Sequence, residues 1–149
     1  MSGGQIPVSP FETGVHDEDG NPLFVVRGEH ANGIHPGKLG VGQKGAHVAA
    51  DNKEHIKLNY EVLAANSGLY WKSINVGDLP KDAVTTGYNV HETLLYSAKG
   101  MIDGNEMIGK YNFKDRKALF PHGGKQYRLN HPQEIQILCF KKEENDGDE

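Results

Sequence analysis

The sequence has little of what secreted or membrane proteins contain. A single cysteine, Cys139, means that no disulfide can form within the chain. No N-x-S/T glycosylation site is present, and the first ten residues lack the charged-then-apolar pattern of a secretory signal. No apolar run approaches the roughly 18 residues that a membrane-spanning helix needs. We therefore expect a cytoplasmic protein without a membrane span, or one that is exported by a non-classical route.

The chain also lacks an excess of basic residues. Its formal net charge is -4, and the last nine residues, KKEENDGDE, hold five acids and two bases. The remaining residues are close to neutral, which argues against nucleic acid as a partner because phosphate binding needs clustered Lys and Arg. The terminal run 141–149 has too few apolar residues to join a core, so we expect a disordered acidic tail.

Helical periodicity is the third absence. The 149 residues include 19 glycines and seven prolines, and hardly any window sustains the apolar spacing of an amphipathic helix. Short runs rich in branched and aromatic residues, bounded by Gly, Asn, Asp or Pro, predict β-strands instead. These runs are LFVVR (23–27), YEVLA (60–64), LYWKSI (69–74), LLYSA (94–98), KALF (117–120) and IQILCF (135–140). The pattern predicts an all-β protein of one compact domain.

An internal repeat organises the chain. The pairs Ile-Pro and Thr-Gly near the start return as Leu-Pro and Thr-Gly at an offset of 73, and LFVVRG returns as LYSAKG at an offset of 72. Gly37-Lys38 matches Gly109-Lys110 at 72, while YEVL matches IQIL at 75. We therefore expect two β-repeats, at 5–66 and 67–140, related by a pseudo-twofold axis and packed on one another because neither buries its apolar face alone.

Signatures of catalysis and of metal binding are missing. There is no G-x-S-x-G motif, and the eight histidines lack the short paired spacing of a zinc site. GNEMIGK (104–110) matches the start of a phosphate-binding loop, but Tyr111 replaces the required Ser or Thr. DEDGN (17–21) fits an acidic turn better than a calcium loop. We expect no enzymatic activity, no cofactor and no metal, and a buried, unreactive thiol at Cys139.

The repeated Gly-Lys pair is the strongest candidate for function. In each repeat a polar loop, a strand and a Gly-Lys turn would lie at the same end of a sheet, where a lysine donor and an Asp or Asn acceptor suit the neighbouring hydroxyls of a sugar ring. The alternative is that Lys38 and Lys110 are solvated turn residues, and the residues alone favour that alternative.

A family resemblance reverses this preference. LFVVRG, PGK and GAHVAADNKEHIKLNYEVLA (45–64), followed in the second copy by GDLPKDAVTTG, LLYSAKG and GGKQYRL (123–129), resemble the DM9 (DM-nine) repeat family over almost the whole chain. Members with two tandem repeats include small invertebrate lectins that bind mannose without calcium and form dimers. The resemblance implies an all-β fold and a sugar site formed by an Asp of the polar loop and the Lys of PGK.

Carried over to this chain, the lysine of the first site is Lys38. The acidic position falls on His16 by simple counting and on Asp17 with a one-residue gap, and we prefer Asp17. The matching residues of the second repeat are Asn89 and Lys110. Asn89 can still accept a hydrogen bond but has no charge, so the second site is expected to be weaker or to prefer another sugar.

The resemblance thus implies a calcium-independent lectin that recognises mannose or mannosylated glycans on microbial surfaces, acts in innate immunity and forms a homodimer. The rival interpretation is an intracellular stress- or infection-response scaffold that binds protein or vesicle partners. The lone cysteine and the absent signal favour that rival, and a glycan array would separate the two.

Overall fold

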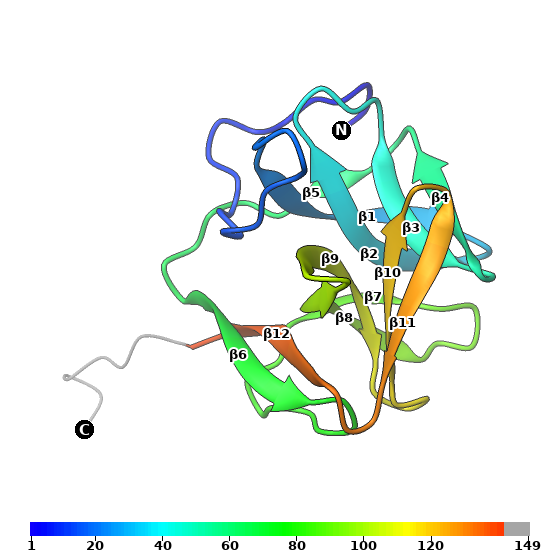
Figure 1. Cartoon of the computed structure of the whole chain (residues 1–149). Coiled ribbons are helices and arrows are strands. Elements are labelled where there is room, and N and C mark those ends of the chain that lie inside the picture. The colour runs from blue at the N-terminus through cyan, green and yellow to red at the C-terminus, as the bar shows by residue number, and fades with distance from the viewer. Residues whose placement is uncertain (142–149) are drawn as a thin grey trace.

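The structure of the protein is a computed structural model that describes residues 1–141 (Figure 1). These residues contain twelve β-strands and no helix, as the punctuated sequence predicts. The strands are β1 (Leu23–His30), β2 (Gly33–Gly40), β3 (Ala46–Ala50), β4 (Lys53–Lys57), β5 (Glu61–Val62), β6 (Leu69–Asn75), β7 (Thr85–Tyr88), β8 (Leu94–Ile102), β9 (Asn105–Asn112), β10 (Lys117–His122), β11 (Lys125–Asn130) and β12 (Glu134–Phe140).

Eight of the strands close into a barrel. The order β2-β3-β4-β11-β10-β9-β8 is one continuous antiparallel path, and β7 closes it by pairing with both β2 and β8. The remaining strands extend the two strands at the closure. On one side β1 and β5 continue from β2, and on the other β12 and β6 continue from β8 (Figure 1). Full closure leaves fewer strand edges unpaired.

The strand pairings confirm the repeat and its offsets. In the first half Val25 lies opposite Lys38, and in the second half Ser97 lies opposite Lys110, both 72 residues later. The final strands keep the offset of 75, since Val26 pairs with Val62 and its counterpart Ala98 pairs with Ile137. The chain therefore consists of two copies of one β-unit, and the limits 5–66 and 67–140 stay a prediction.

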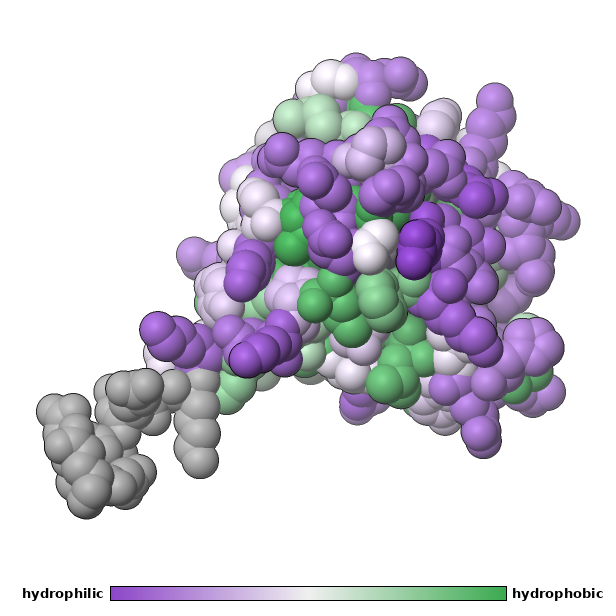
Figure 2. Space-filling model, turned by 90° about the horizontal axis from the view of Figure 1, so that it is seen from below, coloured by the Kyte–Doolittle hydropathy of each residue, from purple (hydrophilic) through white to green (hydrophobic). Residues whose placement is uncertain are grey.

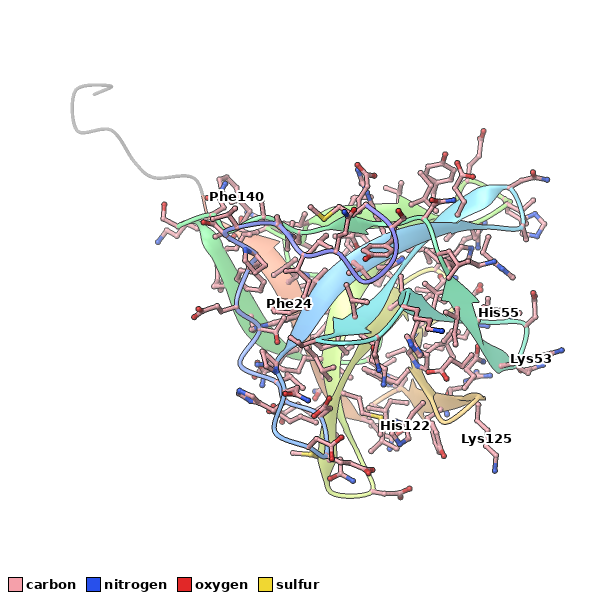
Figure 3. The ribbon with its side chains drawn as sticks, turned by 90° about the horizontal axis from the view of Figure 1, so that it is seen from above. Phe24, Lys53, His55, His122, Lys125 and Phe140 are labelled. Atoms are coloured by element: carbon pink, nitrogen blue, oxygen red, sulfur yellow. The ribbon has the colours of Figure 1, made fainter. Side chains whose placement is uncertain are left out.

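The pseudo-twofold axis passes between β4 and β11. Lys53 pairs with Lys125, which is its own counterpart 72 residues later. Across this junction Gly124 N–H donates to Glu54 Oε1 at 2.9 Å. Figure 3 shows the two hairpins on the same side of the molecule, with Lys53 and His55 on one and His122 and Lys125 on the other. The repeats thus share one continuous sheet.

The core joins the repeats as well. One of its clusters combines Val15, Leu23 and Val25 of the first repeat with Ile108 and Leu138 of the second, all nearly without exposed surface. Fully burying one such aliphatic side chain stabilises a protein by about 1.5–3 kcal/mol. Because much of this burial lies between the repeats, neither is expected to be stable alone.

The Gly-Lys pairs do not lie in turns, and that prediction is wrong. Gly33–Gly40 is the strand β2, and Lys38 lies within it, between β1 and β3. The glycines have a packing reason, because a Cβ on Gly37 would lie 2.1 Å from the His47 carbonyl oxygen. A Cβ on Gly109 would lie 2.1 Å from the Leu119 oxygen. Glycine therefore lets β3 and β10 approach the strands that carry the lysines.

Other predictions are resolved by the same structure. All six sequence runs predicted as strands contribute to strands, but β2, β3, β4, β7, β9 and β11 were not predicted. GNEMIGK lies in the β8–β9 turn and β9, so no helix follows it to bind a phosphate. Cys139 is buried, as expected. Among residues 1–141 no helix has the length and apolar character to span a membrane. The predicted disorder of the acidic tail concerns residues that, after Lys141, lie outside those described.

Candidate functional site

Asp17 begins a tight turn that the sequence identified only as acidic. Its backbone N–H donates to the Asn21 carbonyl at 2.9 Å, and Gly20 N–H donates to the Asp17 carbonyl at 3.0 Å. The side-chain Oδ1 of Asp17 accepts hydrogen bonds from the backbone N–H groups of Asp19 and Asn21, both at 2.9 Å. An Asx side chain that replaces backbone partners in this way fixes the turn.

Asn89 builds the same turn in the second repeat. Its N–H donates to the Thr93 carbonyl at 3.0 Å, and its Oδ1 accepts from His91 N–H at 2.9 Å and from Thr93 N–H at 3.1 Å. Asp17 and Asn89 are therefore structural counterparts, which supports Asp17 over His16 as the residue that matches the family pattern. His16 is exposed beside it.

The turns leave different groups free for a ligand. In both residues Oδ1 already accepts two hydrogen bonds. Asp17 keeps Oδ2, which is an acceptor, whereas Asn89 keeps only its Nδ2 amide, which is a donor. We therefore no longer expect Asn89 to accept a hydrogen bond from a ligand, and expect it to donate one through Nδ2 instead. The second site offers a donor where the first offers a charged acceptor.

The first cavity brings Asp17 and Lys38 together. It measures about 260 Å³ and is lined from the first repeat by His16, Asp17, Glu18, Asp19, Leu23, Lys38 and Gln43. The second repeat completes it with Asn105, Glu106 and Met107 near the start of β9 and with His122 at the end of β10. The two residues that the sequence selected therefore share one polar cavity at the junction of the repeats.

Lys38 is a buried cation in this cavity. Only 6% of its surface is exposed, and within residues 1–141 its Nζ has no hydrogen-bond or ion-pair partner. Burial lowers the pKa of Lys38, and the carboxylates of Glu54 and Asp17 oppose that lowering. Lys38 Nζ is not one of the fully buried unpartnered polar atoms, which among residues 1–141 are His47 Nδ1 and Gln126 Oε1, so it still reaches the space of the cavity. An acceptor oxygen of a ligand in the cavity could therefore bind this ammonium.

Glu54 is held close by on β4. Its Oε2 lies 3.0 Å from His47 Nδ1, and its side chain is only 8% exposed. Burial acts to raise the pKa of Glu54, but the close contact with His47 and the hydrogen bond from Gly124 N–H outweigh it and lower the pKa overall. Glu54 therefore stays ionised and supplies negative charge near Lys38 without neutralising it by contact.

The second cavity brings Asn89 and Lys110 together in the same way. It measures about 310 Å³. From the second repeat it is lined by Asn89, Val90, Leu95, Lys110, Asn112, Asp115, Lys117, Leu119 and Gln126, and from the first by His30, Ala31, His35, Ala50, Asp51 and Asn52. The candidate residues of each repeat are thus completed by a wall from the other repeat.

Lys110 differs from Lys38 because it has a partner. Its Nζ lies 2.7 Å from His35 Nδ1, and both side chains are buried. Burial, followed by the charge of Lys117, lowers the pKa of Lys110 to about 8, and Asp51 opposes this lowering. Burial and the Lys110 charge lower the pKa of His35 to about 3. Near neutral pH the lysine is therefore the donor and neutral His35 the acceptor. In the first cavity the counterpart of His35, 72 residues later, is Met107, which has no imidazole to accept from Lys38.

The turns that lead to the two cavities differ too. The second turn and its flanks carry Tyr88, Val90 and Leu94, which are 42%, 50% and 52% exposed, and of these Val90 lines the cavity. The corresponding positions of the first turn are His16, Glu18 and Pro22. Sequence reasoning missed the residues that the opposite repeat contributes, and the only signal that would find them is the strand order of the closed barrel.

A family model described as DM9 repeat matches residues 17–129. None of the curated proteins matches the chain in sequence. Among solved structures, the fold is similar to that of a nematode sperm cell motility protein, MFP2B, with a TM-score of 0.74 and 17% sequence identity. The similarity covers 95% of this chain and 44% of that one, so this chain spans less than half the length of its structural neighbour. At this identity the likeness concerns the fold alone.

Proposed function

The chain belongs to the DM9 repeat family, and on this basis we propose that it is a calcium-independent lectin that binds mannose or mannosylated glycans. The proposed sites are the two cavities, with Asp17 and Lys38 in the first and Asn89 and Lys110 in the second. No enzymatic activity is part of the proposal. The biological role that fits is recognition of microbial surfaces in innate immunity, by a cytoplasmic protein or one that leaves the cell by a non-classical route.

The observation that carries the proposal is that Lys38, whose ammonium has no hydrogen-bond or ion-pair partner within residues 1–141, lines the same polar cavity as Asp17. A pair of neighbouring sugar hydroxyls can accept from Lys38 Nζ and donate to Asp17 Oδ2 at the same time. The cavity, at about 260 Å³, lies just below the usual range for drug-sized ligands, about 300–1,000 Å³, which suits a single small ring. No metal ion is required for this recognition.

The second cavity is expected to bind more weakly or to prefer another ligand. Lys110 of this cavity already donates to His35, and the amide Nδ2 of Asn89 cannot accept a hydrogen bond from a hydroxyl. One monosaccharide in such a site binds with about -4 to -8 kcal/mol. Two cavities per chain, doubled in the homodimer that we propose, would supply avidity for dense mannose on a cell surface.

Retention on mannose-agarose tests the site. Lys38→Met removes the ammonium while keeping an unbranched side chain, and Asp17→Asn copies the second site, because the amide oxygen can still accept from Asp19 and Asn21. Each change should reduce retention, and Lys38→Met combined with Lys110→Met should abolish it. Retention should be equal with added calcium and with a calcium chelator.

The matched control is Lys72→Met, because Lys72 is exposed on β6 and lines neither cavity. This variant should bind like the unmodified chain. If the doubly substituted protein, with an unchanged far-ultraviolet circular dichroism spectrum, is still retained and eluted by free mannose, then the proposed sites are wrong.

A second candidate function is a scaffold that binds protein or vesicle partners. Figure 2 favours it, since hydrophobic residues gather near the middle of the face seen from below, with hydrophilic residues around them. The structural neighbour is known as a sperm cell motility protein, and that description states a process rather than a sugar ligand. A glycan array decides between the two functions, because a scaffold would show no saccharide preference and a lectin would select mannose-terminated glycans.

A further inference from the structure

Two histidines and an aspartate meet at the rim of the second cavity. His30 ends β1, Asp51 lies in the β3–β4 turn and His55 lies on β4. One ligand atom of each residue lies within 4.8 Å of the others. His30 and Asp51 also line the second cavity. Residues that are 21 and 25 positions away from His30 thus converge, although their spacing in the sequence gives no indication of it.

The contacts already orient these side chains. His30 Nε2 lies 2.9 Å from Asp51 Oδ2, and the His30 and His55 rings have centroids 4.2 Å apart. His55 Nε2 lies 2.9 Å from the Ala50 carbonyl oxygen. When Nε2–H donates to that carbonyl, Nδ1 of the neutral imidazole keeps its lone pair, which is the form of histidine that binds a metal.

The repeat offers a reason to look beyond structural roles. The counterparts of His30, Asp51 and His55 are Ile102, Gly123 and Tyr127, so the second copy builds the same strands and turn without any of the three. The fold therefore does not need a histidine or a carboxylate at these positions. All three residues occur in the first copy only, and there the fold brings their side chains together.

We propose that His30, Asp51 and His55 form a zinc-binding site at the rim of the second cavity. Two imidazole nitrogens and one carboxylate oxygen are ligands of Zn²⁺ in proteins, and three protein ligands leave a fourth position open. In a tetrahedral site, zinc bonds of about 2.0–2.1 Å hold ligand atoms about 3.3–3.4 Å apart, so any separation near the 4.8 Å limit has to shorten. The exposed Asp51 side chain is free to rotate toward the ion.

Charge around the cluster both helps and opposes the ion. Asp51 contributes the negative charge, and its turn position, with φ of 52°, keeps the carboxylate outside the β3–β4 ladder. Lys110, in the same cavity, repels a cation, but its ammonium is directed at His35 rather than at the cluster. The expected affinity is accordingly micromolar, and calcium or magnesium should not compete because both prefer all-oxygen ligand sets.

Isothermal titration of the chelator-treated full chain with zinc chloride tests the site. One zinc ion per chain should bind to the unmodified protein. Asp51→Asn should weaken binding more than about tenfold, since even outer-shell substitutions cause losses of about 10–100-fold. Asparagine accepts the left-handed backbone of position 51, so this variant should fold. His55→Ala should weaken binding at least as much, and calcium chloride should give no heat of binding.

The matched control is His91→Ala, because His91 is exposed and lines neither cavity. It should bind zinc like the unmodified chain. Equal zinc affinity in the unmodified chain, Asp51→Asn and His55→Ala would assign the binding to scattered surface histidines and overturn the proposal, as would the absence of any zinc binding to the unmodified chain. Because sugar plays no part in this titration, its outcome is independent of the lectin proposal.

Discussion

Because His35 is buried as the neutral acceptor for Lys110, the free energy of unfolding should fall at acidic pH. Substitution of His35 should remove this part of the pH dependence. His35 is buried, and burial together with the charges of Lys110, His30 and Lys57 lowers its pKa from 6.5 to about 3, although Asp51 acts in the opposite direction. In the unfolded chain the same imidazole titrates near 6.5. Between these two values the unfolded state therefore binds a proton that the folded state does not.

The sign and size follow from linkage. Stability is fully present above pH 6.5 and falls as the pH is lowered, because the unfolded state binds more protons. The loss attributable to His35 is about 1.4 kcal/mol for each pH unit in the middle of this range. Between pH 6.5 and pH 4.5 it amounts to about 2.3 kcal/mol, a large part of the 5–15 kcal/mol of an ordinary domain.

His35→Met is the perturbation, since Met107 occupies the counterpart position in the first cavity. Urea unfolding of both proteins at pH 7.5, 6.5, 5.5 and 4.5 gives the free energy of unfolding at each pH. The carboxylates and the other histidines titrate in both proteins, so their contributions cancel in the difference. Loss of the acceptor for Lys110 adds a roughly constant penalty of about 1–3 kcal/mol.

From pH 6.5 to pH 4.5 the unmodified protein should therefore lose about 2.3 kcal/mol more unfolding free energy than His35→Met does. A constant difference over this range would show that His35 is protonated as easily in the folded as in the unfolded state. The placement of a neutral His35 as the acceptor for Lys110 would then be refuted.

Two further predictions concern packing. Gly37→Ala should destabilise the protein by about 3 kcal/mol or more in urea unfolding, since its Cβ would meet the backbone of β3. Gly28→Ala should cost less, because the nearest atom, 3.1 Å away, belongs to the Lys57 side chain; equal costs would contradict this account of the Gly-Lys pair. Cys139 should resist thiol reagents in the folded protein and react on unfolding, because burial raises the pKa of its thiol; rapid labelling of the native chain would contradict its burial.

The sequence predicted what depends on local pattern and on self-similarity. Branched and aromatic runs such as those around Val25 and Ile137 indicated strands, and the recurrence of Gly-Lys at Gly109-Lys110 predicted the repeat that the strand registers confirm. It failed at Gly33–Gly40, where three glycines and a proline are typical of a turn. In the structure these residues allow close packing of a buried strand instead.

The composition of the cavities was beyond sequence reasoning for a physical reason. The prediction that Asp17 and Lys38 share a site could be made from the first repeat and the family pattern alone. The residues that complete each cavity, such as Met107 and His122 for the first or His35 for the second, come from the other repeat. Which of them face a given lysine is decided by the closure of the barrel, and closure depends on long-range pairing that no local signal encodes.

The meeting of Lys53 with Lys125 has a consequence for how such a protein can arise. An element that pairs with its own counterpart is the signature of an isologous contact, in which two identical chains associate about a twofold axis. Two separate copies of such a unit, associated about this axis, would form the same barrel and enclose the same two cavities. Within one chain that assembly is permanent, and the copies differ, with methionine at position 107 where the first copy has histidine at position 35.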